Sequence, residues 1–226
     1  MNKSADTKTT FEFLDAYLLF RRVQPNPAIL EAQEKALEKG ALARYNMTKV
    51  DLKTLTFLGG SKSRSIDKEV LGPIPKGLLF TMIKITDFKG SVDTNPYKFK
   101  HYDISEFSLY GNGRRVPSEG LSLDTDHENT SVMGYRTLFE GSVIHHSNTG
   151  LMITHDRYIN GFFMLLFDLT PDHAAPEAHT SLPENGNIRI ELQFSRPLPE
   201  AITCVLYLEY DSTVLINFSR KVTTDF

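Results

Sequence analysis

Histidines beside carboxylates are the residues of this sequence whose types could hold a metal ion. Jelly-roll oxygenases of the cupin type bind iron or manganese through a His-x-His pair and a carboxylate on facing strands. Here His145 and His146 are adjacent, so on a strand their side chains would point to opposite faces. The pairs His155-Asp156 and Asp172-His173 also lack the required spacing. We therefore expect exposed histidines, with no bound metal or other cofactor.

The sequence gives equally little support for nucleophilic or nucleotide chemistry. No Gly-x-Ser-x-Gly sequence is present, and the single cysteine, Cys204, falls on the apolar face of an expected strand, where a thiol is inert packing. Gly111-Asn112-Gly113 lacks the third glycine of a dinucleotide-binding fingerprint, and Asn-Gly between apolar segments is typical of a hairpin turn. Residues 59–63 (GGSKS) lack the first glycine of a phosphate-binding loop. We expect no catalytic residue and no enzymatic activity.

Three acidic side chains, Asp124, Asp126 and Glu128, occupy alternate positions of one expected loop. Such spacing can hold calcium through oxygen ligands, but the glycine and the terminal glutamate of an EF-hand loop are absent. The simpler interpretation is a solvated acidic loop, and a weak divalent-ion site is the alternative.

Charge and hydropathy limit the partners of the chain. The 226 residues carry a formal net charge of -3, which provides no basic field to neutralise phosphates, so we expect no direct nucleic-acid binding. The N-terminus lacks the basic-then-apolar order of a signal peptide, and the longest apolar run, residues 162–167, is too short to cross a bilayer. We therefore expect no membrane contact.

The spacing of apolar residues predicts strands over most of the chain. Residues 187–194 alternate apolar and polar side chains without a break, as a half-buried strand does. Residues 202–210 are apolar on both faces, which is typical of a central strand. Further strands are expected at residues 11–23, 47–57, 78–88, 102–110, 159–169 and 214–218. A change of apolar phase in the second of these predicts a bulge near Lys53. Together they predict an all-β, antiparallel, eight-stranded jelly-roll sandwich.

Helices are expected only in the connections between strands. Asn26 is a good N-cap, Pro27 suits the first helical position, and Gly40 supplies the stop. A shorter helix is expected at about residues 132–140, although Gly134 weakens it. Two segments, residues 59–68 and 171–187, break the periodicity and predict surface loops.

The chain is expected to have a flexible segment at residues 1–10 and one jelly-roll domain at residues 11–226. The strands at residues 162–169 and 202–210 have more apolar surface than a one-sided sheet can cover. A second sheet or a neighbouring jelly roll must therefore lie against them.

Three blocks of the sequence carry a resemblance to a known family. The first is LGPIPKGLLF at residues 71–80, followed by DFKGS at 87–91 and NPYKFKHY at 95–102. The second is YINGFFMLLFDLTPD at 158–172, and the third runs from GNIRIELQF at 186–194 through LYLEYD at 206–211 to RKV at 220–222 and DF at 225–226. In this order and spacing they resemble major capsid (hexon) proteins of Polinton/Maverick elements and their adintovirus relatives. Tyr97 stands where those proteins favour Phe.

The resemblance implies a structural virion component. Members of that family are double jelly-roll proteins that trimerise into pseudo-hexagonal capsomers, and this chain resembles their C-terminal roll. The implied partners are two further copies, neighbouring capsomers and an N-terminal jelly roll. The implied location is the virion, after synthesis in the host cytoplasm and with nuclear assembly as one option. At 226 residues the chain is too short for both rolls. It is then a fragment, a product of a decaying element, or one half expressed separately.

Contacts between copies are expected from the long loops at residues 59–68, 87–101 and 171–187. The candidate interface residues are Asn95, Pro96, Tyr97, Phe99 and His101, because a Pro-fixed turn presents aromatic side chains at a low cost in conformational entropy. The alternative is a turn that packs on the core of its own chain.

Two other functions fit a jelly roll. A lectin-like or cytokine-like binding module would recognise a sugar or a receptor through loops at one end of the sandwich, and would need a secretion route. A cupin-like metalloenzyme would need iron or manganese that is lost when His145 and His146 are replaced.

Overall fold

The computed structural model describes residues 12–91, 93–123, 131–142, 144, 150–173, 175 and 182–224. These residues form two compact units. One unit consists of residues 44–215 with 223–224 and contains nearly all of both sheets, and the other consists of residues 12–43 with 216–222. The predicted division into residues 1–10 and 11–226 stays a prediction.

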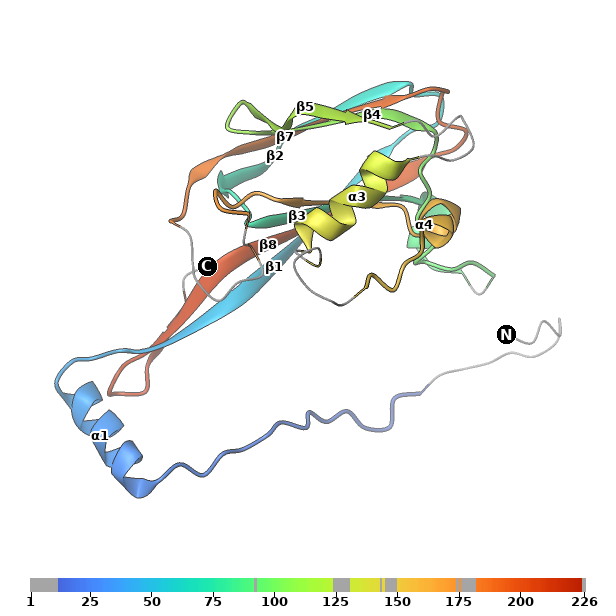
Figure 1. The fold of residues 1–226 in the computed structure, drawn as a ribbon. Coiled ribbons are helices and arrows are strands. Elements are labelled where there is room, and N and C mark those ends of the chain that lie inside the picture. The colour runs from blue at the N-terminus through green and yellow to red at the C-terminus, as the bar shows by residue number, and fades with distance from the viewer. Residues whose placement is uncertain are drawn as a thin grey trace. The chain divides into compact units, whose positions relative to one another are not determined.

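Two antiparallel sheets lie face to face (Figure 1). The first has the strand order β1 (Ala43–Phe57), β8 (Ile202–Ile216), β3 (Gly77–Lys84) and β6 (Met164–Asp168), and the short β9 (Val222–Thr224) also pairs with β8. The second has the order β2 (Ser63–Pro73), β7 (Asn185–Phe194), β4 (Ile104–Gly111) and β5 (Arg114–Ser122).

The strands pair like the two halves of one long hairpin that has been wrapped around a core. At its tip, β4 and β5 are joined by Asn112-Gly113, whose φ angles of 50° and 77° are those that a type I′ turn requires. Away from this tip, β3 pairs with β6, β2 with β7 and β1 with β8, and successive pairs alternate between the two sheets. This is jelly-roll wrapping. The predicted all-β, antiparallel sandwich is confirmed, with β9 as a short ninth strand.

The core lies between the sheets and is fixed by alternation along the strands. In β7 the predicted apolar residues Ile188, Ile190, Leu192 and Phe194 are all buried, while the residues between them are more exposed. Phe107 of the second sheet packs at a tilt against Phe80 of the first, with ring centroids 5.0 Å apart, and stacks on Phe167, with ring centroids 5.2 Å apart. These rings therefore join the two layers.

The described residues form four helices, of which α1 (Pro27–Glu38) precedes the first strand and the other three lie in connections between strands, and the sequence predicted two of the four. The helix α1 begins where Asn26 Oδ1 accepts a hydrogen bond from the Ala28 N–H, and α3 (Val132–Gly141) matches the second predicted helix. The short helices α2 (Ile85–Phe88) and α4 (His155–Gly161) fall where strands were predicted, at residues 78–88 and 159–169. The first predicted strand therefore extended too far at its C-terminal end, and the second began too early, each including part of a short helix.

Several other strand predictions need correction. Residues 12–23 have neither helix nor strand, residues 214–216 are the end of β8, and the loop predicted at residues 59–68 contains the start of β2. β2 and β5 went unpredicted because both are edge strands with largely polar sequences, and β2 buries only Ile66 and Val70.

The bulge predicted near Lys53 is also wrong. Exposure alternates without a break from Lys49 to Phe57, so β1 is regular there. The apolar phase changes because Val50 and Leu52 lie on the exposed face of the strand, whereas Leu55 and Phe57 lie on the inner face.

Candidate assembly surfaces

The described part of the chain contains no group of three or more His, Cys, Asp or Glu side chains placed to hold a metal ion. His155 and Asp156 open α4, and Asp172 and His173 follow β6. His145, His146, Asp124, Asp126 and Glu128 lie outside the described residues. Within the described residues, no helix is both long and apolar enough to span a membrane.

Cys204 lies near the start of β8 with its thiol buried in the core, as the sequence predicted. Burial raises the pKa of this thiol far above its usual range, because a thiolate would lose its hydration there. A thiol that stays protonated and inaccessible has no role as a nucleophile.

The predicted interface loop divides into an exposed part and an anchored part. Asn95 Oδ1 accepts a hydrogen bond from the Tyr97 N–H at 2.9 Å, and this turn leaves the Tyr97 side chain 70% exposed. Phe99 is anchored, because its N–H donates to Gly161 O and its carbonyl accepts from the Phe163 N–H. The ring of His101 packs edge-on against Phe163, 6.1 Å between centroids.

The loop is therefore fastened to the body immediately after the residues that it presents. Pro96 is exposed beside Tyr97, whereas Phe99 and His101 are half-buried. Within the predicted set, the geometry suits Tyr97 for contact with another molecule, and the contact itself stays a prediction.

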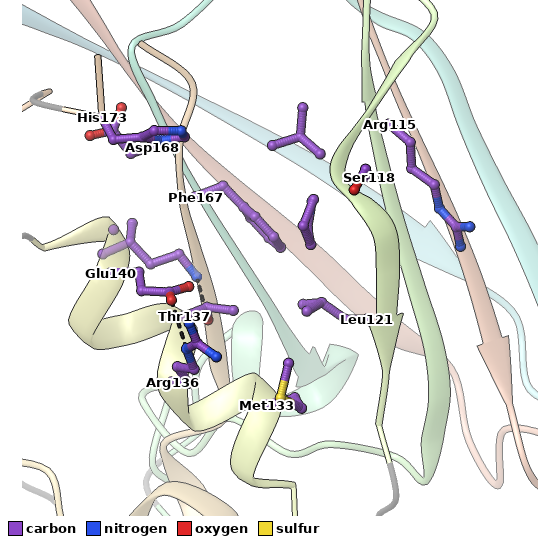
Figure 2. A pocket seen from close by; sticks show the side chains of 14 residues that line it. Arg115, Ser118, Leu121, Met133, Arg136, Thr137, Glu140, Phe167, Asp168 and His173 are labelled. Carbon is purple, nitrogen blue, oxygen red and sulfur yellow. Dashed lines mark hydrogen bonds and ion pairs between the residues drawn. The ribbon is translucent and has the colours of Figure 1, made fainter. Parts of the chain in front are cut away.

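A cavity of about 690 Å³ opens between β5 and α3, with β6 at its back (Figure 2). Phe167 and Leu121 give it apolar walls, and the charged groups at its rim already have partners. Arg136 pairs with Glu140 at 2.6 Å, and the Asp168 carboxylate accepts hydrogen bonds from the Thr170 and Ala175 N–H groups. The Thr137 hydroxyl donates to the Gly134 carbonyl oxygen, and a cavity with these apolar walls can receive an apolar side chain.

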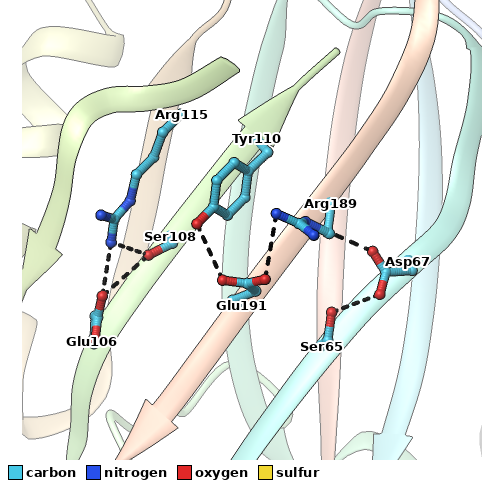
Figure 3. A network of polar contacts seen from close by, with 8 residues as sticks. All are labelled: Ser65, Asp67, Glu106, Ser108, Tyr110, Arg115, Arg189 and Glu191. Atoms are coloured by element: carbon cyan, nitrogen blue, oxygen red, sulfur yellow. Dashed lines mark hydrogen bonds and ion pairs between the residues drawn. The ribbon is translucent and has the colours of Figure 1, made fainter. Parts of the chain in front are cut away.

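The outer face of the second sheet carries two separate groups of polar interactions, one joining β5 with β4 and the other joining β4, β7 and β2 (Figure 3). These interactions are Arg115–Glu106 at 2.7 Å, Tyr110 Oη–Glu191 at 3.2 Å, Arg189–Glu191 at 3.5 Å, Arg189–Asp67 at 4.0 Å and Ser65 Oγ–Asp67 at 2.7 Å. Exposed ion pairs of this kind contribute little stability each. The two groups instead mark this face as the one that meets water, while the other face of the sheet meets the core.

Exposed apolar side chains gather elsewhere, in the segment before α1. Among residues 12–23, seven large apolar side chains are 65–94% exposed: Phe13, Leu14, Tyr17, Leu18, Leu19, Phe20 and Val23. Sequence reasoning missed this feature by assigning the segment to a core strand. One signal was available, because the segment is apolar in both strand phases and ends in Arg21-Arg22, so no single buried face is defined.

No model of a known protein family matches the chain. An uncharacterized protein of Caenorhabditis elegans is 22% identical to it over 222 residues, covering 96% of this chain and 52% of that protein. The chain therefore spans about half the length of this curated relative.

Among solved structures, a chain of the Sputnik virophage superposes with a TM-score of 0.51 at 12% identity, covering 82% of this chain and 39% of the other. A chain of the PBCV-1 virus capsid superposes with a TM-score of 0.50 at 10% identity, covering 86% and 54%. A PBCV-1 crystal structure fitted into a Sputnik reconstruction gives a TM-score of 0.53 at 12% identity over the same shares. This chain has the fold of viral capsid chains. It spans about 40–55% of their lengths.

Proposed function

We propose that this protein is a structural capsid subunit whose jelly roll associates with further copies into trimeric capsomers. The observation that carries the proposal is the wrapped pairing of eight strands, which superposes over 82–86% of the chain on chains of the Sputnik virophage and the PBCV-1 capsid. The superposition on these viral chains concerns the fold. The side chains on the surface support the proposed role in assembly independently.

The surface is suited to contact and poorly suited to turnover. The described residues hold no metal-binding cluster, and the thiol of Cys204 is buried. Large apolar side chains are exposed before α1 and along β1, and Tyr97 stands out from an anchored loop. Soluble monomers rarely expose apolar patches of this kind, which instead mark contacts with other molecules.

The finer assignment rests on the sequence blocks at residues 71–102, 158–172 and 186–226. Their resemblance to Polinton/Maverick and adintovirus major capsid proteins supports the proposal that the chain is one roll of a double jelly-roll capsomer, located in the virion. A second roll is then a partner of this one, in agreement with the chain's spanning 52% of its curated relative.

Negative-stain electron microscopy of the purified full chain at increasing concentration tests this function. The proposal predicts three-fold particles and, at high concentration, hexagonally packed sheets. Particles that stay the size of one jelly roll, together with specific binding on a glycan array, would contradict it and favour a lectin-like module.

A further inference from the structure

Besides the three-residue β9, which pairs with β8 alone among the described strands, each sheet has two edge strands, and three of these four edges are blocked. At β6, the Leu166 N–H donates to Thr137 Oγ1 of α3 at 3.2 Å, so the helix occupies that edge. At β2, the register shifts between Ile66 and Val70. At β5, Pro117 lacks a donor and the pairing of β5 with β4 is itself irregular. Bulges, prolines and covering helices are the means by which proteins prevent further strands from pairing at an edge.

The fourth edge, β1, contains no proline, although it does carry charged side chains at Lys49, Asp51 and Lys53. Within the described residues it is a fifteen-residue strand with one strand neighbour, β8, and its alternation is regular over Lys49–Phe57. Its apolar residues Tyr45, Met47, Val50 and Leu52 are 45–57% exposed. A long, regular edge with apolar side chains is the kind that accepts an added strand.

The segment before α1 has the properties of such a strand. Residues 12–23 are apolar in both phases, since Phe13, Tyr17 and Leu19 fall in one phase and Leu14, Leu18 and Phe20 in the other. These side chains remain 65–94% exposed in the single chain. Fully extended, twelve residues reach about 40 Å, within the about 50 Å that a fifteen-residue strand such as β1 offers.

We infer that residues 12–23 of one copy add as an extra strand to the β1 edge of a second copy. Main-chain hydrogen bonds would supply the affinity, and the added strand would cover Val50 and Leu52 with apolar side chains. Each copy gives one segment and receives one, so the contact can pass head-to-tail from copy to copy, and it closes into a ring of three where the rotation between copies is one third of a turn. The inference deepens the proposed function by naming the contact that joins copies of the chain.

Cross-linking between two cysteine variants tests this contact. One full-length chain carries L18C, and a second, enlarged by a tag, carries L52C. They are mixed and treated with a short bifunctional maleimide, which tolerates a shift of register. The native Cys204 is buried and gives the unsubstituted background. Because the partners differ in size, a mixed product is recognised on a gel.

A mixed cross-linked species supports the inference. In the matched control, the tagged chain carries M152C and keeps Leu52. Met152 is also strongly exposed but lies outside β1, so this pair of chains should give no mixed product. A chain carrying both L18C and L52C that links only within itself, without mixed species, overturns the inference, as does the absence of any link. Trimers that persist in either case would leave the proposed capsid function standing with a different contact.

Hydrogen exchange on the full chain gives a second readout that does not depend on cysteines. Replacing Leu14 and Leu18 by serine in the segment should speed amide exchange in β1 and leave exchange in β7, at the centre of the other sheet, unchanged. Equal exchange in β1 with and without the substitutions would overturn the inference.

Discussion

At the scale of single residues, Phe107 holds the two sheets together. Its ring is 1% exposed, packs at a tilt against Phe80 and stacks on Phe167 of the opposite sheet. We expect Phe107→Ala to lower the free energy of unfolding by about 3–5 kcal/mol, because it leaves a cavity between the layers. Urea denaturation measures this loss, with Met152→Ala, at an 89% exposed side chain, as the neutral control. A loss for Phe107→Ala no larger than that of the control would refute the packing.

Cys204 gives a pH dependence whose sign follows from its burial. The folded state raises the pKa of its thiol, so above about pH 8.5 the unfolded chain releases this proton while the folded chain keeps it. The folded state then binds more protons than the unfolded state, and stability falls as the pH rises. Below that pH the thiol keeps its proton in both states, and its contribution to the free energy of unfolding is fully present.

Denaturation midpoints between pH 7 and 10 measure this effect. Cys204→Ala should make the alkaline decline shallower, whatever it does to the midpoint at pH 7. Identical slopes in the two proteins would show that the thiol ionises as easily in the folded state as in the unfolded one.

Tyr97 belongs to the residue scale as well, because its side chain is held out by the turn at Asn95. We expect Tyr97→Ala to weaken the packing of capsomers into sheets while leaving the unfolding midpoint within about 0.5 kcal/mol of the parent, as is usual for exposed positions. Electron microscopy and urea denaturation provide the two measurements. Unchanged sheets, or a large loss of stability, would instead favour a turn that serves its own core.

At the scale of elements, the contact of α3 with β6 depends on a residue without a side chain. A Cβ added to Gly141 would lie 2.6 Å from Leu166 Cγ and 2.8 Å from the Leu166 carbonyl oxygen. Gly141→Ala must therefore move the helix away from the strand that it covers, and we expect a loss of about 1–3 kcal/mol, as for other overpacked sites. Thermal unfolding tests it, with Gly150→Ala, which meets no atom within 4 Å, as the control. Equal stability of the two variants would mean that α3 is not packed on β6 as described.

Sequence periodicity predicted the elements whose burial is one-sided and failed where it is not. β7 was predicted nearly residue for residue, because its buried and exposed positions alternate strictly. β2 and β5 are polar edge strands, held by pairing with β7 and β4 more than by their own burial, so their sequences look like loops. For residues 12–23 the error was the opposite one: their apolar sequence predicted a strand of the sandwich, but their apolar side chains are exposed.

At the scale of the whole molecule, the topology could not be derived from local pattern. β1 and β8 lie at opposite ends of the chain and pair only after the strands between them have wrapped, and no local spacing encodes such a contact. The jelly roll was therefore reached by counting strands and by resemblance. Of the candidate surfaces, the sequence predicted the Tyr97 loop, whose side chain is exposed and whose role as an interface stays a prediction, whereas the open edge of β1 follows from the protection of the other three edges.

The central claim is that this jelly roll exists to bind further copies, and the molar mass of the purified full chain tests it most directly. Multi-angle light scattering on a size-exclusion column should give a species with three times the mass of one 25.6 kDa chain. This trimer either persists on dilution or dissociates as the concentration falls. A mass of one chain at every concentration up to the solubility limit would contradict the claim.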